Sequence, residues 1–147
     1  EIKHLMKSIN NGVDGWIEVI VINSAFEEIT IVLVVEEYIE EVKKFEYRLL
    51  YLKFKDLLYF DFKREKNTSE TTEGGFSFAH IDNKFMISLL SFPVEGIQPK
   101  TEKEYKNTDF YVIAKRCKYF INKNVGIFEN IRKSIRNEYI LNKFEEL

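Results

Sequence analysis

The segment Tyr47–Phe62, YRLLYLKFKDLLYFDF, is dense in Leu, Tyr and Phe. Its centre is Lys55-Asp56, the one place in the segment where two polar residues adjoin. Aromatic residues favour the pleated, half-buried surface of a sheet. We therefore interpret the segment as two buried strand segments that meet at a kink or tight turn, and we expect the other strands to pair with it or pack on it.

The composition is typical of one folded domain, residues 1–147. Hydrophobic residues make up 45% of the chain and aromatic residues 15%, which is too rich for intrinsic disorder and sufficient for a core. The length of 147 residues is that of an ordinary single domain.

On the N-terminal side of the central segment, the apolar residues of 1–9 recur at helical spacing, and Asn10-Asn11-Gly12 ends the pattern. Residues 16–22 (WIEVIVI) and 29–35 (ITIVLVV) predict a hairpin. The second strand has no polar alternation and should be buried on both faces. For the acidic link 36–46 we favour a loop or helical turn, with a strand beginning near Phe45.

On the C-terminal side, Asp82-Asn83 separates the predicted strands 76–81 and 84–92, and both residue types tolerate the positive φ of a two-residue hairpin turn. A long strand is expected over 109–121. The residues 63–75 and 93–108 contain turn-forming and charged residues and are interpreted as loops. Tyr51–Phe60 and Tyr111–Phe120 share Tyr, Lys, Tyr and Phe at the same offsets, which indicates a weak repeat or two strands that bend at corresponding points.

The last segment, 125–147, has Phe128, Ile131, Ile135 and Tyr139 on one face of a predicted helix. This helix could pack on the sheet, or residues 127–144 could form a homodimer. The predicted fold class is α+β: a curved, mainly antiparallel sheet of about six or seven strands, with a C-terminal helix and a minor N-terminal helix.

Charge and hydropathy argue against two classes of partner. The net charge is −2, which offers no overall field for nucleic acid, although residues 115–147 carry eight basic and four acidic side chains. The longest apolar run, Ile29–Val35, is far shorter than the ~20 residues that span a bilayer. We therefore predict no nucleic-acid and no membrane partner. The lone Cys117 permits no internal disulfide, which fits a cytoplasmic protein.

Few side chains could carry catalysis or hold a cofactor. His80 and Asp82 alternate along a predicted strand and could form a metal or acid–base pair, but a half-buried His beside a turn Asp is the simpler interpretation. Cys117 lies between Arg116 and Lys118, yet strand alternation turns both cations away from the thiol. Gly74-Gly75 lacks the flanking residues of a nucleotide-binding loop. We predict no catalytic residue, no metal and no cofactor, with His80 and Asp82 as an alternative pocket.

The residues 16–35 (WIEVIVINSAFEEITIVLVV) and 47–62 resemble small bacterial immunity-type domains of polymorphic-toxin and contact-dependent-inhibition systems. The resemblance covers about a third of the chain and includes no diagnostic motif. It implies a cytoplasmic, non-catalytic protein that neutralises a toxin through an exposed and often acidic face.

The leading hypothesis is therefore a protein-binding module, most concretely an immunity protein whose partner is a toxin domain. Its surface would include loops 63–75 and 98–108. A small enzyme or ligand-binding protein with a pocket in the curved sheet is the alternative. The acidic excess before residue 115 suits the first hypothesis, and we place the partner surface on five carboxylates of the acidic link: Glu36, Glu37, Glu40, Glu41 and Glu46.

Overall fold

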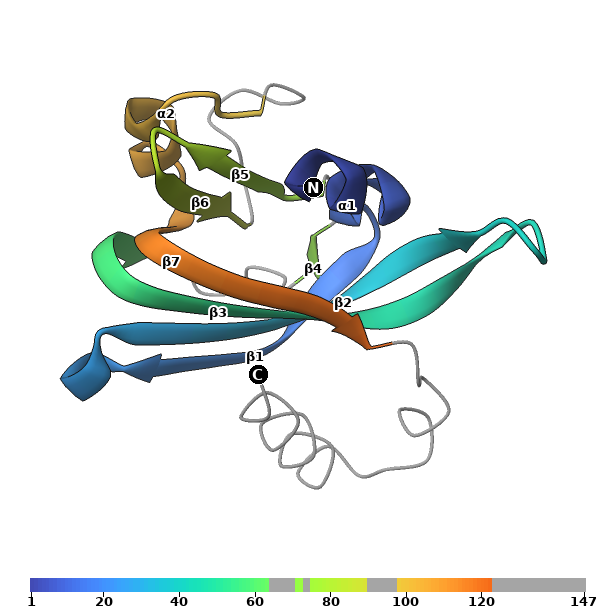
Figure 1. Ribbon diagram of the computed structural model, residues 1–147, viewed down its shortest axis with the longest axis horizontal. Helices are drawn as coiled ribbons and strands as arrows, with labels where there is room; N and C mark the ends of the chain where they lie inside the picture. Colours follow the sequence, from blue (N-terminus) through green and yellow to red (C-terminus); the bar gives the residue numbers. More distant parts are fainter. Residues whose placement is uncertain (64–70, 73–74, 90–97, 123–147) are drawn as a thin grey trace.

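The computed structural model describes residues 1–63, 71–72, 75–89 and 98–122. They form one antiparallel, strongly curved sheet of seven strands in the order β4-β1-β2-β3-β7-β6-β5, with short helices at its side (Figure 1). The predicted fold class is confirmed in this respect. The elements are α1 (Ile2–Ser8), η1 (Asn10–Gly12), β1 (Gly15–Asn23), η2 (Ser24–Phe26), β2 (Glu28–Ile39), β3 (Lys44–Phe62), β4 (Thr71–Thr72), β5 (Ser77–Ile81), β6 (Lys84–Ser88), α2 (Glu102–Lys106) and β7 (Phe110–Asn122).

The predicted hairpin of β1 and β2 is confirmed, with η2 as its connection. The middle of β2 lies in the interior of the sheet, between β1 and β3. Five consecutive residues, 31–35, are at most 1% exposed. Because side chains alternate between the faces of a strand, this run covers both faces with apolar groups, as its lack of polar alternation predicted.

β3 is one continuous strand of 19 residues, so the two predicted strand segments meet at a kink within it and not at a tight turn. The prediction of a kink at Lys55-Asp56 is confirmed: Asp56 has φ 55°, and the pairing with β7 shifts register between Leu57 and Tyr59. The bend lets Phe54 and Leu57, three residues apart, reach the same core. The side-chain alternation that would keep them on opposite faces is interrupted there.

The two similar segments 51–60 and 111–120 lie side by side in β3 and β7, in antiparallel register, with Lys55 opposite Arg116. β7 also interrupts its alternation, since Ala114 and Cys117 both face the core that Phe54 contacts. Arg116 Nε donates a hydrogen bond to the Asp56 carboxylate at the bend. The central charges of the two segments therefore mark a shared bend between paired strands.

β5 and β6 form the predicted hairpin, and Asp82 (φ 49°) and Asn83 (φ 59°) form its two-residue turn. β6 continues the sheet by pairing with residues 111–114 of β7. The hairpin curls over the concave face, where Phe78 lies edge-on to Phe54 at 6.1 Å between ring centroids.

The interpretation of 93–108 as a loop is wrong for part of this range, because α2 occupies Glu102–Lys106. Its N-terminus has a capping box, in which the side chain of Thr101 accepts from the Glu104 N–H and the Glu104 carboxylate accepts from the Thr101 N–H. This reciprocal pair satisfies two backbone donors that a helix leaves open. The T-x-x-E pattern was visible in the sequence.

α1 and η1 confirm the predicted N-terminal helix and its end at Asn10-Asn11-Gly12. The η1 turn holds the start of β5 in place, because the Phe76 N–H donates to the Asn11 carbonyl at 2.9 Å. The approach is close: a Cβ on Gly12, which has φ +73°, would lie 2.1 Å from the Phe76 ring. Only glycine accommodates both the positive φ and this contact.

The main core fills the concave side of the sheet, between α1, the β5–β6 hairpin and the long strands. A smaller cluster, Val32, Val34, Leu49 and Tyr51, lies on the opposite face of β2 and β3. The predicted C-terminal helix, and with it the homodimer through 127–144, lies outside the described residues and stays a prediction. So do most of the predicted loop 63–75 and the end of the predicted strand 84–92.

Candidate functional site

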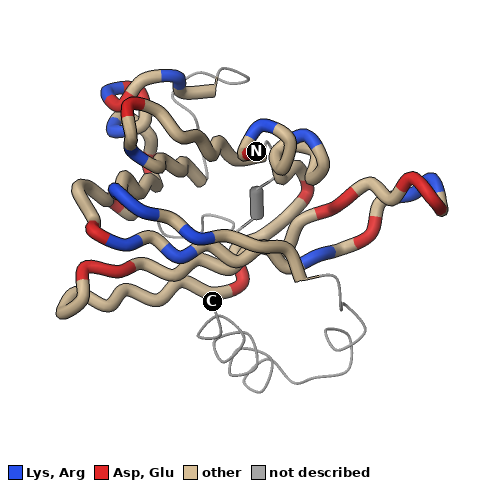
Figure 2. Tube along the Cα trace, viewed as in Figure 1, with Lys and Arg blue, Asp and Glu red and all other residues tan. Residues whose placement is uncertain are grey.

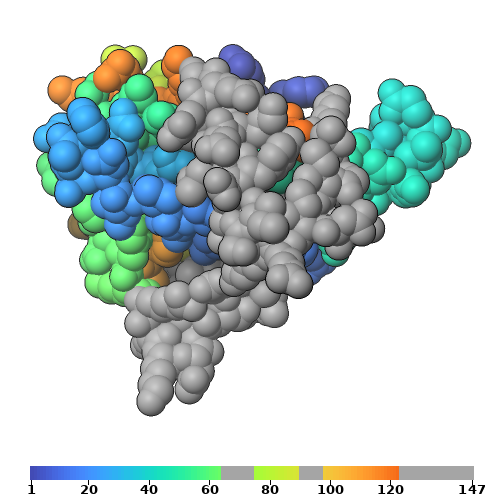
Figure 3. Space-filling view, turned by 90° about the horizontal axis from the view of Figure 1, so that it is seen from below, coloured from blue at the N-terminus to red at the C-terminus, as the bar shows by residue number. Residues whose placement is uncertain are grey.

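Residues 36–47, which we call the arm, project beyond the rest of the sheet as the end of the β2–β3 hairpin (Figures 1 and 3). The prediction of a loop or helical turn here is wrong. β2 runs on to Ile39, β3 begins at Lys44, and residues 40–43 form the turn. The expected strand start near Phe45 is confirmed. Pairing continues in register along the whole arm.

The register gives the arm two different faces. Glu36 lies opposite Tyr47 and Tyr38 opposite Phe45, so these pairs share one face. The other face carries Glu37 directly opposite Glu46. Like charges in that position repel and destabilise a ladder unless a cation lies between them.

Arg48 is that cation, and its side chain is only 9% exposed. Its Nε donates to Glu37 at 3.1 Å, its Nη2 to Glu46 at 2.9 Å, and its Nη1 to the Tyr47 carbonyl at 3.2 Å. The hydrogen bond from Arg48 is the first cause that holds the pKa of Glu46 below its ordinary value. A buried guanidinium with three partners fixes the base of the arm.

The opposite face presents a line of rings, Trp16, Tyr47, Phe45 and Tyr38, which we call the aromatic row. Trp16 contacts Tyr47 with ring centroids 5.5 Å apart, and Tyr38 meets Phe45 edge-on at 5.2 Å. The outer three rings are well exposed: Tyr38 38%, Phe45 47% and Tyr47 45%. Large exposed aromatic groups gathered on one face are typical of protein-binding surfaces.

Three of the carboxylates of the arm border the aromatic row, and Figure 2 shows acidic stretches on both strands of the arm. Glu36 is on the same face as Tyr47, while Glu40 and Glu41 lie in the turn beside Val42, which is 53% exposed. The arm contains five carboxylates and two lysines.

The predicted site residues thus fall into two groups with different tasks. Glu37 and Glu46 are joined through Arg48 and belong to the support of the arm, whereas Glu36, Glu40 and Glu41 border the exposed surface. Arg48 and the aromatic row were not predicted as functional. If residues 36–46 had been interpreted as a hairpin, strand alternation would have placed Tyr38, Phe45 and Tyr47 on one face. That placement would have indicated the aromatic row.

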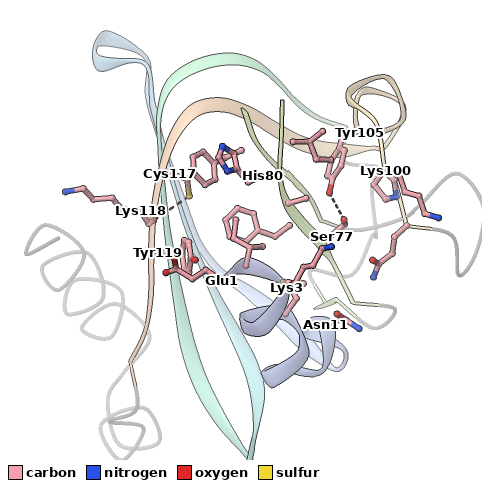
Figure 4. A pocket seen from close by; sticks show the side chains of 18 residues that line it. Glu1, Lys3, Asn11, Ser77, His80, Lys100, Tyr105, Cys117, Lys118 and Tyr119 are labelled. Carbon is pink, nitrogen blue, oxygen red and sulfur yellow. Dashed lines mark hydrogen bonds between the residues drawn. The ribbon is translucent and has the colours of Figure 1, made fainter. Parts of the chain in front are cut away.

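A second feature is an open cleft of about 1330 Å³ on the concave side, bordered by α1, β5, the segment 98–105 and β7 (Figure 4). Lys3 and Lys100 line it together with Glu1 and His80, whereas the side chain of Lys118 points away from it. At its inner end the Ser77 hydroxyl and the Tyr105 hydroxyl form a buried hydrogen bond of 2.6 Å.

The structure places His80 in the cleft but does not place Asp82 there. The His80 ring stacks on Phe85 with centroids 4.2 Å apart and an interplanar angle of 7°. Asp82 is exposed in the β5–β6 turn. The cleft therefore has an imidazole stacked on a ring, without the Asp82 carboxylate of the predicted pair.

Burial raises the pKa of two further ionisable groups of the cleft, Cys117 and Tyr119. Burial raises the pKa of the half-buried Cys117 thiol well above its ordinary value. Burial is also the first cause that raises the pKa of Tyr119 to about 12, with Glu1, which lies beside it in Figure 4, as a further cause. A thiol that stays protonated is a poor nucleophile.

Within the described ranges, no three His, Cys, Asp or Glu side chains are grouped so that they could hold a metal ion. In the same part of the chain, no helix is long and apolar enough to cross a membrane. Comparisons with protein-family models, with curated proteins and with solved structures gave no match.

Proposed function

We propose that this protein is a non-catalytic protein-binding module and that the arm is its contact surface. The observation that carries the proposal is the exposed aromatic row, which is held on a rigid base by Arg48 and bordered by carboxylates. Binding hot spots are enriched in aromatic residues, and rim charges guide the approach of a partner. The partner would present an apolar groove with a basic rim.

The most concrete form of the proposal is an immunity protein that blocks a bacterial toxin domain. Its support is the resemblance of residues 16–35 and 47–62 to immunity-type domains, together with the acidic charge of the arm. A toxin domain that acts on nucleic acid would carry a basic surface, and an acidic arm would complement it.

The first experiment uses the intact chain as bait in lysate of the source organism, in moderate salt. Wild type, Phe45→Ala and Phe26→Ala are compared. Phe26 lies in η2 at the end of the other hairpin and is 72% exposed, so it controls for loss of an exposed phenylalanine. We expect one stoichiometric partner that wild type and Phe26→Ala retain and Phe45→Ala loses.

The toxin form of the proposal has its own readout. The captured partner is expressed alone and then together with wild type or Phe45→Ala in a bacterial host. We expect growth arrest by the partner alone, rescue by wild type and weaker rescue by the variant. A partner that leaves growth unaffected contradicts the immunity assignment but not the binding surface, and equal capture by Phe45→Ala contradicts the surface.

A further inference from the structure

The cleft runs along the outer edge of β5, which is the last strand of the sheet. Phe78 and His80 project from one face of β5, and Ser77, Ala79 and Ile81 from the other, yet all five line the same cleft. Both faces can border one space only if that space extends around the edge between them. The strand edge itself is therefore open to the cleft.

The register identifies which backbone groups point out of this edge. In a two-residue hairpin the residues flanking the turn, Ile81 and Lys84, exchange both hydrogen bonds, and the exchange recurs at every second pair. The N–H and C=O groups of Phe78 and His80 consequently point away from β6. Phe76, two residues before Phe78, follows the same alternation, because its N–H points away from β6 and donates to the Asn11 carbonyl.

Asn11 pairs with the edge only at Phe76. No other described segment forms a backbone hydrogen bond with Phe78 or His80 from the outer side of β5. An open strand edge is a template for one more strand, and native proteins usually cover or charge such edges. Here the edge lies in a cleft whose walls are α1 and the segment 98–105.

We propose that the cleft binds an extended, net-acidic peptide segment of a partner protein, which adds to the outer edge of β5 as a further strand. Main-chain hydrogen bonds to Phe78 and His80 would hold the peptide, as in other cases of strand addition. The volume of about 1330 Å³ exceeds the roughly 300–1,000 Å³ common for small-molecule pockets. A recessed edge admits a single chain more readily than the edge of a second folded sheet.

The side chains around the edge define the chemistry of the peptide. On the concave side, Phe78, Met6 and Tyr119 form an apolar surface for one peptide side chain. Lys3 and Lys100 are exposed on the two walls of the cleft and favour carboxylates in the flanking residues. The proposal does not rest on the arm, which is a separate part of the surface.

The test selects short random peptides displayed on phage against the intact chain. The best peptide is then measured by fluorescence anisotropy on wild type, His80→Ala and His80→Pro. Proline removes the outward N–H and is tolerated at the open side of an edge strand, whereas alanine keeps the N–H and removes the ring. We expect net-acidic peptides, binding that falls at least about tenfold in His80→Pro, and a change within about threefold in His80→Ala.

A second measurement needs no variant protein. Methylation of successive backbone nitrogens of the peptide should weaken binding to wild type at alternate positions only, because only every second N–H faces β5. This scan decides the matter if thermal unfolding shows that His80→Pro is not folded. Phe45→Ala should bind the peptide like wild type, so failure of the proposed arm surface and failure of this site are distinguishable.

Four results of the peptide experiments would overturn the proposal. They are the absence of any enriched peptide, equal binding to a folded His80→Pro, a methylation scan without alternation, and loss of binding in His80→Ala, which would point to the imidazole as the recognising group. A concentration-dependent dimer in light scattering that His80→Pro abolishes would assign the edge to a second copy of the chain instead.

Discussion

The middle and the end of the β2–β3 ladder share one uninterrupted register but differ in what their side chains do. Around Leu33 and Leu50 both faces are apolar and buried. In the arm, one face carries the Arg48 network and the other the exposed aromatic row. The same backbone pairing thus provides a core where β1 and β7 flank it, and a candidate binding surface in the arm, which lies beyond the residues that those strands pair with.

The largest difference should appear in stability. Leu52 is fully buried, and Leu52→Ala should lower the free energy of unfolding by about 2–5 kcal/mol, because it removes apolar contacts and leaves a cavity. Phe45→Ala should lower it by about 1 kcal/mol or less, since Phe45 is 47% exposed. Urea denaturation followed by circular dichroism measures both. Equal losses would mean that the arm is part of the folding core.

The next effect concerns the base of the arm. Arg48→Met leaves Glu37 and Glu46 opposite each other without their cation, and we expect a loss of about 1–3 kcal/mol. Amide hydrogen exchange should accelerate in 36–47 and stay slow in 49–54. Lys44→Met is the control, because the exposed Lys44 only approaches Glu46 at 3.6 Å and should contribute less than about 0.5 kcal/mol.

Charge at the tip of the arm should affect association without affecting stability. Glu40→Lys combined with Glu41→Lys should weaken binding of the captured partner about tenfold at low salt and reduce its salt dependence, since rim charges act mainly on the approach of a partner. Glu27→Lys, at the end of the other hairpin, and His80→Ala should leave this binding unchanged. Calorimetry at two salt concentrations measures the binding of each variant. An effect of Glu27→Lys as large as that of the tip variant would refute a specific role for the charges at the tip of the arm.

The smallest expected effect is a change in the pKa of Glu46. The pKa of Glu46 is lowered from its ordinary value of 4.5, first by the hydrogen bond from Arg48. A carboxylate with a lowered pKa in the folded state contributes stability above its unfolded pKa, and the contribution is lost as pH falls through the folded value. NMR titration should find a midpoint below 4.5 in wild type and a higher midpoint in Arg48→Met. Glu102, whose pKa is lowered first by Lys84, should titrate alike in both proteins.

Local patterns predicted most of the sheet. The β-branched runs of β1 and β2, the Asp82-Asn83 turn and the charged bend at Lys55-Asp56 each have a signature within a few residues. The similarity of segments 51–60 and 111–120 also has a structural explanation, because they are paired strands that bend together. Two local predictions were wrong, the loop or helical turn over 36–46 and the loop over the residues of α2, whose capping box lies in a range rich in prolines and charges.

The candidate sites were harder to predict, because they depend on contacts across strands. The acidic residues of the arm were identified, but the division between Glu37 and Glu46 at the base and Glu36 at the surface follows from a register that composition does not reveal. The cleft contains His80 without Asp82, and the feature that distinguishes it is the open edge of β5. That edge results from the strand order, in which β5 pairs with β6 alone among the described strands.

The most direct test of the binding surface is site-specific photo-cross-linking with benzoylphenylalanine in place of Phe45 or of Phe26. The two positions are exposed phenylalanines at the ends of different hairpins, so labelling differs only in location. With the captured partner present, the label at Phe45 should cross-link to it efficiently and the label at Phe26 should not. Efficient cross-linking at Phe26 without cross-linking at Phe45 would contradict the assignment of the arm as the contact surface.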